Sequence, residues 1–559
     1  MRHVSIFIAA LCLFFGTQTH AAKQPNIVII MADDMGFSDI GCYGSEIRTP
    51  NVDSLAEGGL QFTQMYNSAR CCPSRAALLT GVNPQQAGVG HMVADLGWPA
   101  YQGYLNESSV TIAEGLKANG YATMMSGKWH VGGTYNLLDP ASWNPGDASH
   151  PIPTQRGFDR FFGIITGAGS FYHPLTLMRD DQLIPIDTDG FYFTDAISDN
   201  AVDMIEDAAQ GDNPFFIHIA YTSPHWPLHA LEEDIARYQG VYKDGWDSLR
   251  TGRHEEMKGR GIVDSKWEIS PRDESAPAWS DAREKDWEAL RMAAYAAQID
   301  IMDQGIGRVL SKLKELGIAD NTLVMFLSDN GGCAEFLAED SDRPTPAQYG
   351  TPTPDGRPIR MGNSPRIRPG PADTFMSYDL PWANASNTPF RRFKRWTHEG
   401  GISTPFIMSW PARIQESGVV HEPIHIIDIA ATCMDAASAT YPTQMNDHDT
   451  TPLEGESVLS VLENPTWSRE KPIFWEHEGS RAVRIGEWKL VAPVGGEWEL
   501  YNIDDDRTEI HNLGNSNKPK AQELAKLYDE WAERCGVLPW RILYPAWNPR
   551  MRTPSGHRV

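Results

Sequence analysis

Four short apolar runs, each followed at once by polar or charged side chains, constrain this chain more than any other feature. The runs are Asn26–Met31, Tyr121–Met125, Pro214–Tyr221 and Thr322–Leu327. Uninterrupted apolar runs of this length are typical of strands buried on both faces of a sheet. Helical patterns lie between them, over Val110–Gly120 and Leu290–Gly317. This alternation predicts an α/β fold built on a mostly parallel sheet.

Polar side chains follow each of these runs. They are Asp33 and Asp34 after the first, Lys128 and His130 after the second, His225 after the third, and Asp329 and Asn330 after the fourth. The carboxyl ends of parallel strands share one edge of the sheet, and ligands bind at that edge. We therefore expect these side chains to converge on one site.

The oxygen-bearing members of this set indicate a metal. Carboxylate and amide oxygens from Asp33, Asp34, Asp329 and Asn330 suit a hard divalent cation such as Ca²⁺ or Mg²⁺. Taken alone, an Asp at a strand end usually caps the next helix. Three carboxylates packed together without a cation would repel one another, so the repeated pattern favours a site.

The basic candidates each have an ordinary alternative. Lys128 fits a solvated loop lysine, and His225 fits a turn residue beside Pro224. His229 is interpreted as a loop residue. Lys394, in the basic run FRRFKRW, precedes a glycine turn and a further apolar run, so it is placed to reach the same sheet edge.

The first 22 residues predict a secretory signal peptide. Arg2 precedes the apolar run IFIAALCLFFG, and a small-residue cleavage site follows near Ala21 or Ala22. The apolar run is short for a membrane span. We therefore expect an exported protein, periplasmic or secreted, without a stable membrane anchor.

Six cysteines remain after the leader, scattered over a long chain, so they do not form a dense disulfide framework. One or two bridges stay open as an interpretation, including a vicinal one between Cys71 and Cys72. The formal charge of −25 argues against nucleic-acid binding. An anionic substrate would need a local positive site to overcome the repulsive field of the whole chain.

The stretch from Cys71 to Gly81, CCPSRAALLTG, carries the strongest motif. Its pattern C-x-P-S-R-x-x-L-L-T-G resembles the signature of the formylglycine-dependent sulfatases. Five further segments occur in the family's order and extend the resemblance over nearly the whole chain: PNIVIIMADDMGFSDIGCYG, SGKWH, PHWPL, SDNGG and THEGG.

This resemblance implies a fold, a cofactor and a role for each candidate. The fold is alkaline-phosphatase-like, with a mixed, mostly parallel sheet sandwiched by helices. Cys71 becomes formylglycine, Arg75 holds it, and Cys72 fills a variable, incidental position. Metal ligands, usually of Ca²⁺ with Mg²⁺ as the alternative, are Asp33, Asp34, Asp329, Asn330 and residue 71. The groups that bind sulfate are Lys128, His225 and Lys394, and His130 partners the formylglycine hydroxyl.

The chain changes character near Pro472. Short alternating runs with tight turns, then the helical pattern of residues 518–535, predict a small antiparallel sheet with one helix. The apolar residues Ala521, Leu524, Leu527 and Trp531 of this helix fall on one face. We thus expect a signal peptide over 1–22, a catalytic domain over 23–470, and a small C-terminal domain with a surface tail over 471–559.

The predicted activity is hydrolysis of sulfate monoesters, on a sulfated small molecule or glycan, after activation by a formylglycine-generating enzyme. A phosphonate monoester or phosphodiester hydrolase of the same superfamily is the first alternative, because it can carry the same signature. A catalytically silent carbohydrate-binding protein is the second. It predicts degraded site residues, and the sequence shows none. Two Trp-containing segments, 231–288 and 371–387, fit either substrate contacts or core packing. The oligomeric state stays open.

Overall fold

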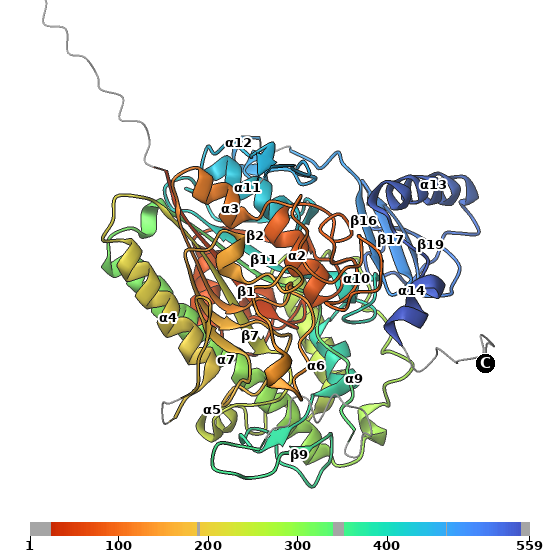
Figure 1. Cartoon of the computed structure of the whole chain (residues 1–559). Helices are drawn as coiled ribbons and strands as arrows, with labels where there is room; N and C mark the ends of the chain where they lie inside the picture. The colour runs from red at the N-terminus through yellow and green to blue at the C-terminus, as the bar shows by residue number, and fades with distance from the viewer. Residues whose placement is uncertain (1–23, 187–189, 339–351, 446, 465–466, 549–559) are drawn as a thin grey trace, which may run out of the picture.

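The computed structural model of this chain describes residues 24–186, 190–338, 352–445, 447–464 and 467–548 (Figure 1). The predicted leader, residues 1–22, lies outside these ranges. No helix within them has the length and hydropathy that a membrane span requires. None of the six described cysteines forms a disulfide.

A large mixed sheet forms the centre of the molecule. Its strands lie in the order β12 (Gly418–Val420), β2 (Leu60–Tyr66), β11 (Ser403–Ser409), β8 (Thr322–Ser328), β1 (Asn26–Asp33), β7 (Phe215–Pro224), β3 (Ala122–Lys128), β4 (Arg160–Ile164), β5 (Leu177–Arg179) and β6 (Gln182–Leu183), and β13 (Ile424–His425) also pairs with β2. The four predicted strands are the neighbours β8, β1, β7 and β3, and each pair is parallel. Their carboxyl ends therefore share one edge, as expected.

Helices cover both faces of this sheet. One face packs against α1 (Pro50–Glu57), α4 (Phe193–Ala208) and α7 (Lys285–Glu315), and the other packs against α2 (Cys71–Thr80), α3 (Ile112–Ala118) and α11 (Asp428–Ala436). Alternate residues of β1 serve the two layers: Val28 and Ile30 join the first core, and Ile27 and Ile29 join the second. This arrangement explains why the central part of β1, residues 27–32, is apolar on both faces.

Helix α3 is shorter than the pattern predicted. The expected range was Val110–Gly120, and the helix begins at Ile112 because Thr111 caps it. The Thr111 hydroxyl oxygen accepts from the Glu114 backbone N–H at 3.0 Å, and the Glu114 carboxylate accepts from the Thr111 N–H at 2.7 Å. This reciprocal pair is a capping box.

The C-terminal segment forms a separate antiparallel sheet, seen in blue at one side of the main body in Figure 1. Its strands are β16 (Ile473–His477), β17 (Ser480–Ile485), β18 (Trp488–Ala492) and β19 (Glu499–Asn502). Helix α13 (Lys518–Cys535) packs on it and buries Leu524, Tyr528 and Trp531. The predicted small antiparallel domain with one helix is confirmed.

The expected surface tail is partly wrong. Residues 540–547 form helix α14 (Trp540–Trp547), and its Leu543 is buried against Leu96 and Tyr101 of the main body. The apolar side chains of this segment give the helix a face to bury, which a solvated tail would leave exposed. Residues 549–559 lie outside the described part of the chain.

Tryptophans of both inserted segments lie in the core or pack against it. Trp246, in α6 (Gly245–Gly259), and Trp382, in α9 (Asp379–Ser386), are almost fully buried with ring centroids 5.3 Å apart. Trp279 packs edge-on against Trp246 at 4.7 Å. For these three side chains the core-packing interpretation holds.

Candidate active site

All the predicted site residues meet at the carboxyl edge of the sheet. Asp33 ends β1, Lys128 ends β3, and His225 follows β7 directly, while Asp329 and Asn330 follow β8. Cys71 is the first residue of α2. Lys394 comes from the loop before α10 (Glu399–Ile402), where its backbone N–H donates to the Gly332 carbonyl at 3.1 Å. None of the ten predicted residues is more than 6% exposed.

The acidic residues interlock across β1 and β8. The Asp34 backbone N–H donates to Asp329 Oδ1 at 3.2 Å, and the Asn330 amide donates to Asp34 Oδ1 at 2.7 Å. Asp34 adopts a positive φ of 67°, which turns the chain sharply after the strand. Two buried oxygens, Asp33 Oδ1 and Asn330 Oδ1, have no hydrogen-bond partner among the described residues. Unpartnered oxygens in an all-oxygen donor set fit a hard divalent cation.

Three positive side chains pair with the three carboxylates. Lys128 Nζ lies 2.6 Å from Asp33 Oδ2. Lys394 Nζ lies 2.6 Å from Asp34 Oδ1. Arg75 Nη2 lies 2.8 Å from Asp329 Oδ2 and 3.6 Å from Asp33 Oδ2. Every one of these side chains is nearly inaccessible to solvent, so the pairs are not screened as surface pairs are.

The surroundings of the carboxylates shift their pKa values in opposite directions. Burial, together with the neighbouring Asp33 carboxylate, raises the pKa of Asp329 to about 8. Burial acts on Asp34 in the same direction, but Lys394 and His225 outweigh it and hold the pKa of Asp34 below its usual value. Crowded carboxylates at different pKa values are typical of functional sites.

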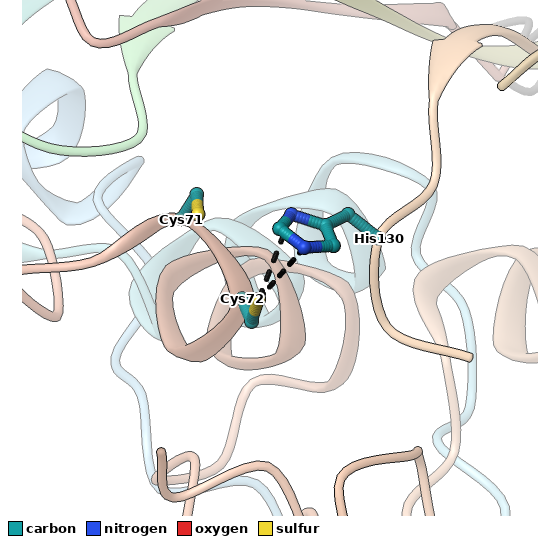
Figure 2. Close-up of side chains that lie close together, drawn as sticks. All are labelled: Cys71, Cys72 and His130. Carbon is teal, nitrogen blue, oxygen red and sulfur yellow. Dashed lines mark hydrogen bonds between the residues drawn. The ribbon is translucent and has the colours of Figure 1, made fainter. Parts of the chain in front are cut away.

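Cys71 lies at the N-terminus of α2 among these charges. The hydrogen bond from the Cys72 thiol, followed by the charges of Lys128, His130 and Lys394, holds the pKa of Cys71 well below its usual value. Figure 2 shows both cysteines at the start of the helix, with the imidazole of His130 beside Cys72. The Cys72 sulfur lies 3.3 Å from His130 Nε2 and 3.5 Å from Nδ1. Cys72 is therefore a direct neighbour of His130, and its interpretation as incidental stays a prediction.

Both site histidines are neutral near pH 7. Burial lowers the pKa of His130 to about 4 and the pKa of His225 to about 4. His225 Nδ1 faces the Trp226 carbonyl oxygen at 2.7 Å, so this nitrogen carries the proton in the neutral ring. His225 Nε2 faces Asp34 Oδ2 at 3.4 Å. His229, interpreted as a loop residue, is buried and its Nε2 lies 2.7 Å from the Thr374 carbonyl oxygen.

Three supporting residues escaped the sequence interpretation. Ser74 Oγ accepts from the Ser68 backbone N–H at 2.9 Å and fixes the turn that leads into α2. Glu335 lies 2.9 Å from Arg70, the residue before Cys71. Gly167 leaves room for His130, because a Cβ there would lie 2.3 Å from the imidazole Cε1. Ser74 belongs to the signature, whereas no sequence pattern distinguishes Glu335 or Gly167.

Solved structures confirm the alkaline-phosphatase-like fold. The crystal structure of Ps i-CgsB in complex with k-i-k-neocarrahexaose matches with a TM-score of 0.64 and 25% identity, over 91% of this chain and 93% of that one. The phosphonate monoester hydrolase of Agrobacterium radiobacter matches with a TM-score of 0.54 and 18% identity, over 92% of this chain and 96% of that one. The second likeness shows the shared fold alone.

Sequence relatives match over most of their own length. An uncharacterised sulfatase of Schizosaccharomyces pombe is 30% identical over 96% of this chain and 99% of its own. The arylsulfatase of Klebsiella aerogenes is 31% identical over 81% of this chain and 96% of its own. The sulfatase family model matches residues 25–439, and the model for the C-terminal part of N-sulphoglucosamine sulphohydrolase matches residues 390–534. With nearly the whole described chain matched, this protein belongs to the sulfatase family, whose members are sulfuric ester hydrolases.

Proposed function

We propose that residue 71, matured from cysteine to formylglycine, is the centre at which this sulfatase hydrolyses sulfate monoesters. One observation carries the proposal: Cys71 begins α2 next to three buried ion pairs. Arg75, Lys128 and Lys394 form these pairs with the carboxylates of Asp329, Asp33 and Asp34. The aldehyde requires modification by a formylglycine-generating enzyme, which is the expected maturation partner.

The charge balance of the site favours an anionic substrate. When Asp33, Asp34 and Asp329 are ionised, as ligands of a cation must be, they balance the three permanent positive charges. A divalent cation would leave the site with a net charge of about +2, which attracts a sulfate ester despite the acidic surface of the protein. We propose that Asp33, Asp34, Asp329 and Asn330, with residue 71, hold this cation, Ca²⁺ first and Mg²⁺ as the alternative.

Formylglycine at residue 71 would be the nucleophile, and a divalent cation would activate it. A hydrated aldehyde at residue 71 would supply the attacking hydroxyl, and a cation held by Asp33, Asp34, Asp329 and Asn330 would supply its electrostatic activation. Arg75 orients this end of α2, because it pairs with Asp329 and donates to the Lys128 carbonyl at 3.0 Å. Lys128 and Lys394 bind the sulfate oxygens and stabilise the charge that develops there.

The two histidines take different proton-transfer roles. His130 is neutral and able to accept the proton of the second formylglycine hydroxyl when sulfate leaves. His225 is neutral in the free protein, so it must gain a proton before it can donate one to the leaving alcohol. A bound ester anion beside His225 and Asp34 raises the pKa of His225 and favours that proton on Nε2.

The experiment that tests this function compares two substrates on formylglycine-containing protein. We expect kcat/KM on an aryl sulfate to exceed that on the matching aryl phosphonate, because two lysines and a histidine surround the bound group. Turnover confined to the phosphonate would replace the proposal with the phosphonate hydrolase. Protein that is correctly matured, binds sulfated glycans and releases sulfate from none of them would support the silent binding protein.

The natural substrate class is proposed to be a carbohydrate sulfate, with a sulfated small molecule as the alternative. Support comes from Ps i-CgsB, whose structure holds a neocarrahexaose. We also propose export to the periplasm or medium, a catalytic domain over residues 23–470 and a C-terminal domain over 471–559. The start of the antiparallel sheet at Ile473 supports that boundary.

A further inference from the structure

We propose that His91, His477 and Glu478 form a second metal site, for Zn²⁺ or a similar divalent transition metal, where the C-terminal sheet meets the main body. His91 comes from the loop that follows α2. His477 ends β16, and Glu478 lies in the turn to β17. The inference is independent of the sulfatase chemistry, because none of the three residues belongs to the ten-residue site.

The three side chains are close enough to share one ion. One ligand atom from each lies within 4.8 Å of the others. Two nitrogens bound to the same tetrahedral Zn²⁺ at about 2.0–2.1 Å are about 3.4 Å apart. Shifts of the ligand atoms by about an ångström would therefore bring three protein ligands onto one ion, and water would take the fourth tetrahedral position.

The imidazole nitrogens of His91 and His477 support the site independently of its geometry. His91 is 1% exposed and His477 is 0% exposed, yet Nδ1 and Nε2 of both rings lack a hydrogen-bond partner among the described residues. A neutral imidazole has one donor and one acceptor, and buried polar groups of this kind are nearly always paired. A metal bound to one nitrogen of each ring removes much of this desolvation cost.

Neighbouring charges leave a carboxylate oxygen available. Arg395 pairs with Glu478 Oε2, whereas Oε1 faces His477 Nε2 at 3.7 Å. Arg70, the other nearby guanidinium, pairs with Glu335. Arg70 also interacts electrostatically with Glu478, and Arg395 would act as the outer hydrogen-bond donor that ligating carboxylates usually have.

The donor set selects a different ion from that of the catalytic site. Two imidazoles and one carboxylate suit Zn²⁺ and its neighbours, whereas Ca²⁺ prefers oxygen ligands alone. The rings of Trp540 and Trp547, from α14, lie 5.1 and 4.6 Å from the His91 ring. The ion would thus join the loop after α2 to the β16–β17 turn, beneath the C-terminal helix.

The test measures zinc bound to the full-length protein. Wild type is equilibrated with Zn²⁺ in excess Ca²⁺, freed of unbound metal by gel filtration and analysed for elemental zinc. We expect about one Zn²⁺ per chain in wild type and at least a tenfold lower content in Glu478→Gln and His477→Asn. Two controls, Asp34→Asn in the catalytic centre and Cys72→Ala beside His130, should keep the zinc of wild type.

Two further measurements on folded protein, Co²⁺ absorption and the Tm with Zn²⁺, test the assigned ligands. Co²⁺ added to wild type should give the visible absorption of a tetrahedral site without the thiolate charge-transfer band that Cys71 or Cys72 would produce. Zn²⁺ should raise the Tm of wild type and leave that of Glu478→Gln unchanged. No retained zinc in wild type, equal zinc in Glu478→Gln, or a thiolate band from bound Co²⁺ would each overturn the assignment.

Discussion

The sulfur of Cys72 lies 3.3 Å from Nε2 of His130, although Cys72 occupies the variable position of the sulfatase signature. Consecutive residues of a helix point in directions about 100° apart. At the start of α2, His130 interacts with both cysteines, and its ring contacts the Cys72 sulfur directly. The hydrogen bond from Cys72 holds the pKa of Cys71 below its usual value, whereas burial raises the pKa of Cys72, so we expect the two cysteines to differ in function.

Replacing Cys71 by Ala should abolish turnover, whereas Cys72→Ala should retain it within about tenfold. In the proposed mechanism Cys71 is the source of the aldehyde, whereas Cys72 makes only a sulfur contact with His130. Both rates are measured on an aryl sulfate, and the mass of the peptide containing residue 71 reports the modification. Equal loss in both variants, with the fold intact and formylglycine present in Cys72→Ala, would assign an essential role to Cys72.

Removing the catalytic cation should remove activity, and Ca²⁺ should restore it. Without a cation, Asp33 and Asn330 keep buried oxygens unpartnered, and burial together with Asp33 keeps the pKa of Asp329 near 8. The measurement is the rate of aryl sulfate hydrolysis after exhaustive chelation, followed by addition of Ca²⁺ or Mg²⁺. A metal-free protein, verified by elemental analysis, that keeps its full rate would contradict the assigned ligands.

Lys394→Ala should lower kcat/KM for an aryl sulfate by about 100- to 1,000-fold, the usual loss of one preorganised charge-stabilising group. Lys394 is buried and pairs with Asp34, so the variant also leaves that carboxylate without its main partner. Lys526→Ala, on the exposed face of α13, serves as the matched control and should match wild type. A loss below threefold would exclude Lys394 from contact with the sulfate.

Gly167→Ala should lower kcat about 100-fold, because displacement of a catalytic group by about 1 Å has that order of effect. The new Cβ would lie 2.3 Å from His130 Cε1 and push the ring from its position. Gly169→Ala is the control two residues away, where the nearest atom to a new Cβ is at 3.7 Å. Neither glycine has a positive φ, so a drop in both variants would point to the loop rather than to the ring.

Glu399→Gln should destabilise the protein in a pH-dependent manner. Glu399, in α10, lies 2.7 Å from Lys489 of β18 and 3.0 Å from Arg507, all fully buried, so it links the C-terminal sheet to the main body. Despite burial, these two partners lower the pKa of Glu399 from 4.5 to about 2.

The contribution of Glu399 to stability depends on pH because the folded and unfolded states bind different numbers of protons. The folded state binds fewer protons than the unfolded state between pH 4.5 and 2, so the contribution of Glu399 is complete above pH 4.5 and is lost as pH falls through that window. The shift corresponds to about 3 kcal/mol of unfolding free energy. Urea unfolding of wild type and Glu399→Gln should show a difference at pH 6 that shrinks by more than half at pH 3. If the difference in unfolding free energy does not change with pH, the ion pairs of Glu399 do not cause the acid sensitivity.

The sequence alone predicted four neighbouring strands of the sheet, β8, β1, β7 and β3, with polar side chains at their carboxyl ends. Apolar runs that are followed by DD, SGKWH, PHW and SDN predict buried parallel strands with polar carboxyl ends, because the apolar pattern of a strand lies in consecutive residues. Lys394 comes from a loop, and its place before a glycine turn and an apolar run predicted that it reaches this edge, whereas Cys71 and Arg75 were assigned only through the resemblance.

Tertiary structure alone decided which side chains face one another across long sequence distances. The contacts of Gly167 with His130, Glu399 with Lys489, and His91 with His477 join segments between 37 and 386 residues apart, counted from their residue numbers. No local period records such a contact, because it depends on how loops and domains close on the sheet. The helical C-terminus was missed for the same reason: Leu543 is buried only because Leu96 and Tyr101 lie opposite it.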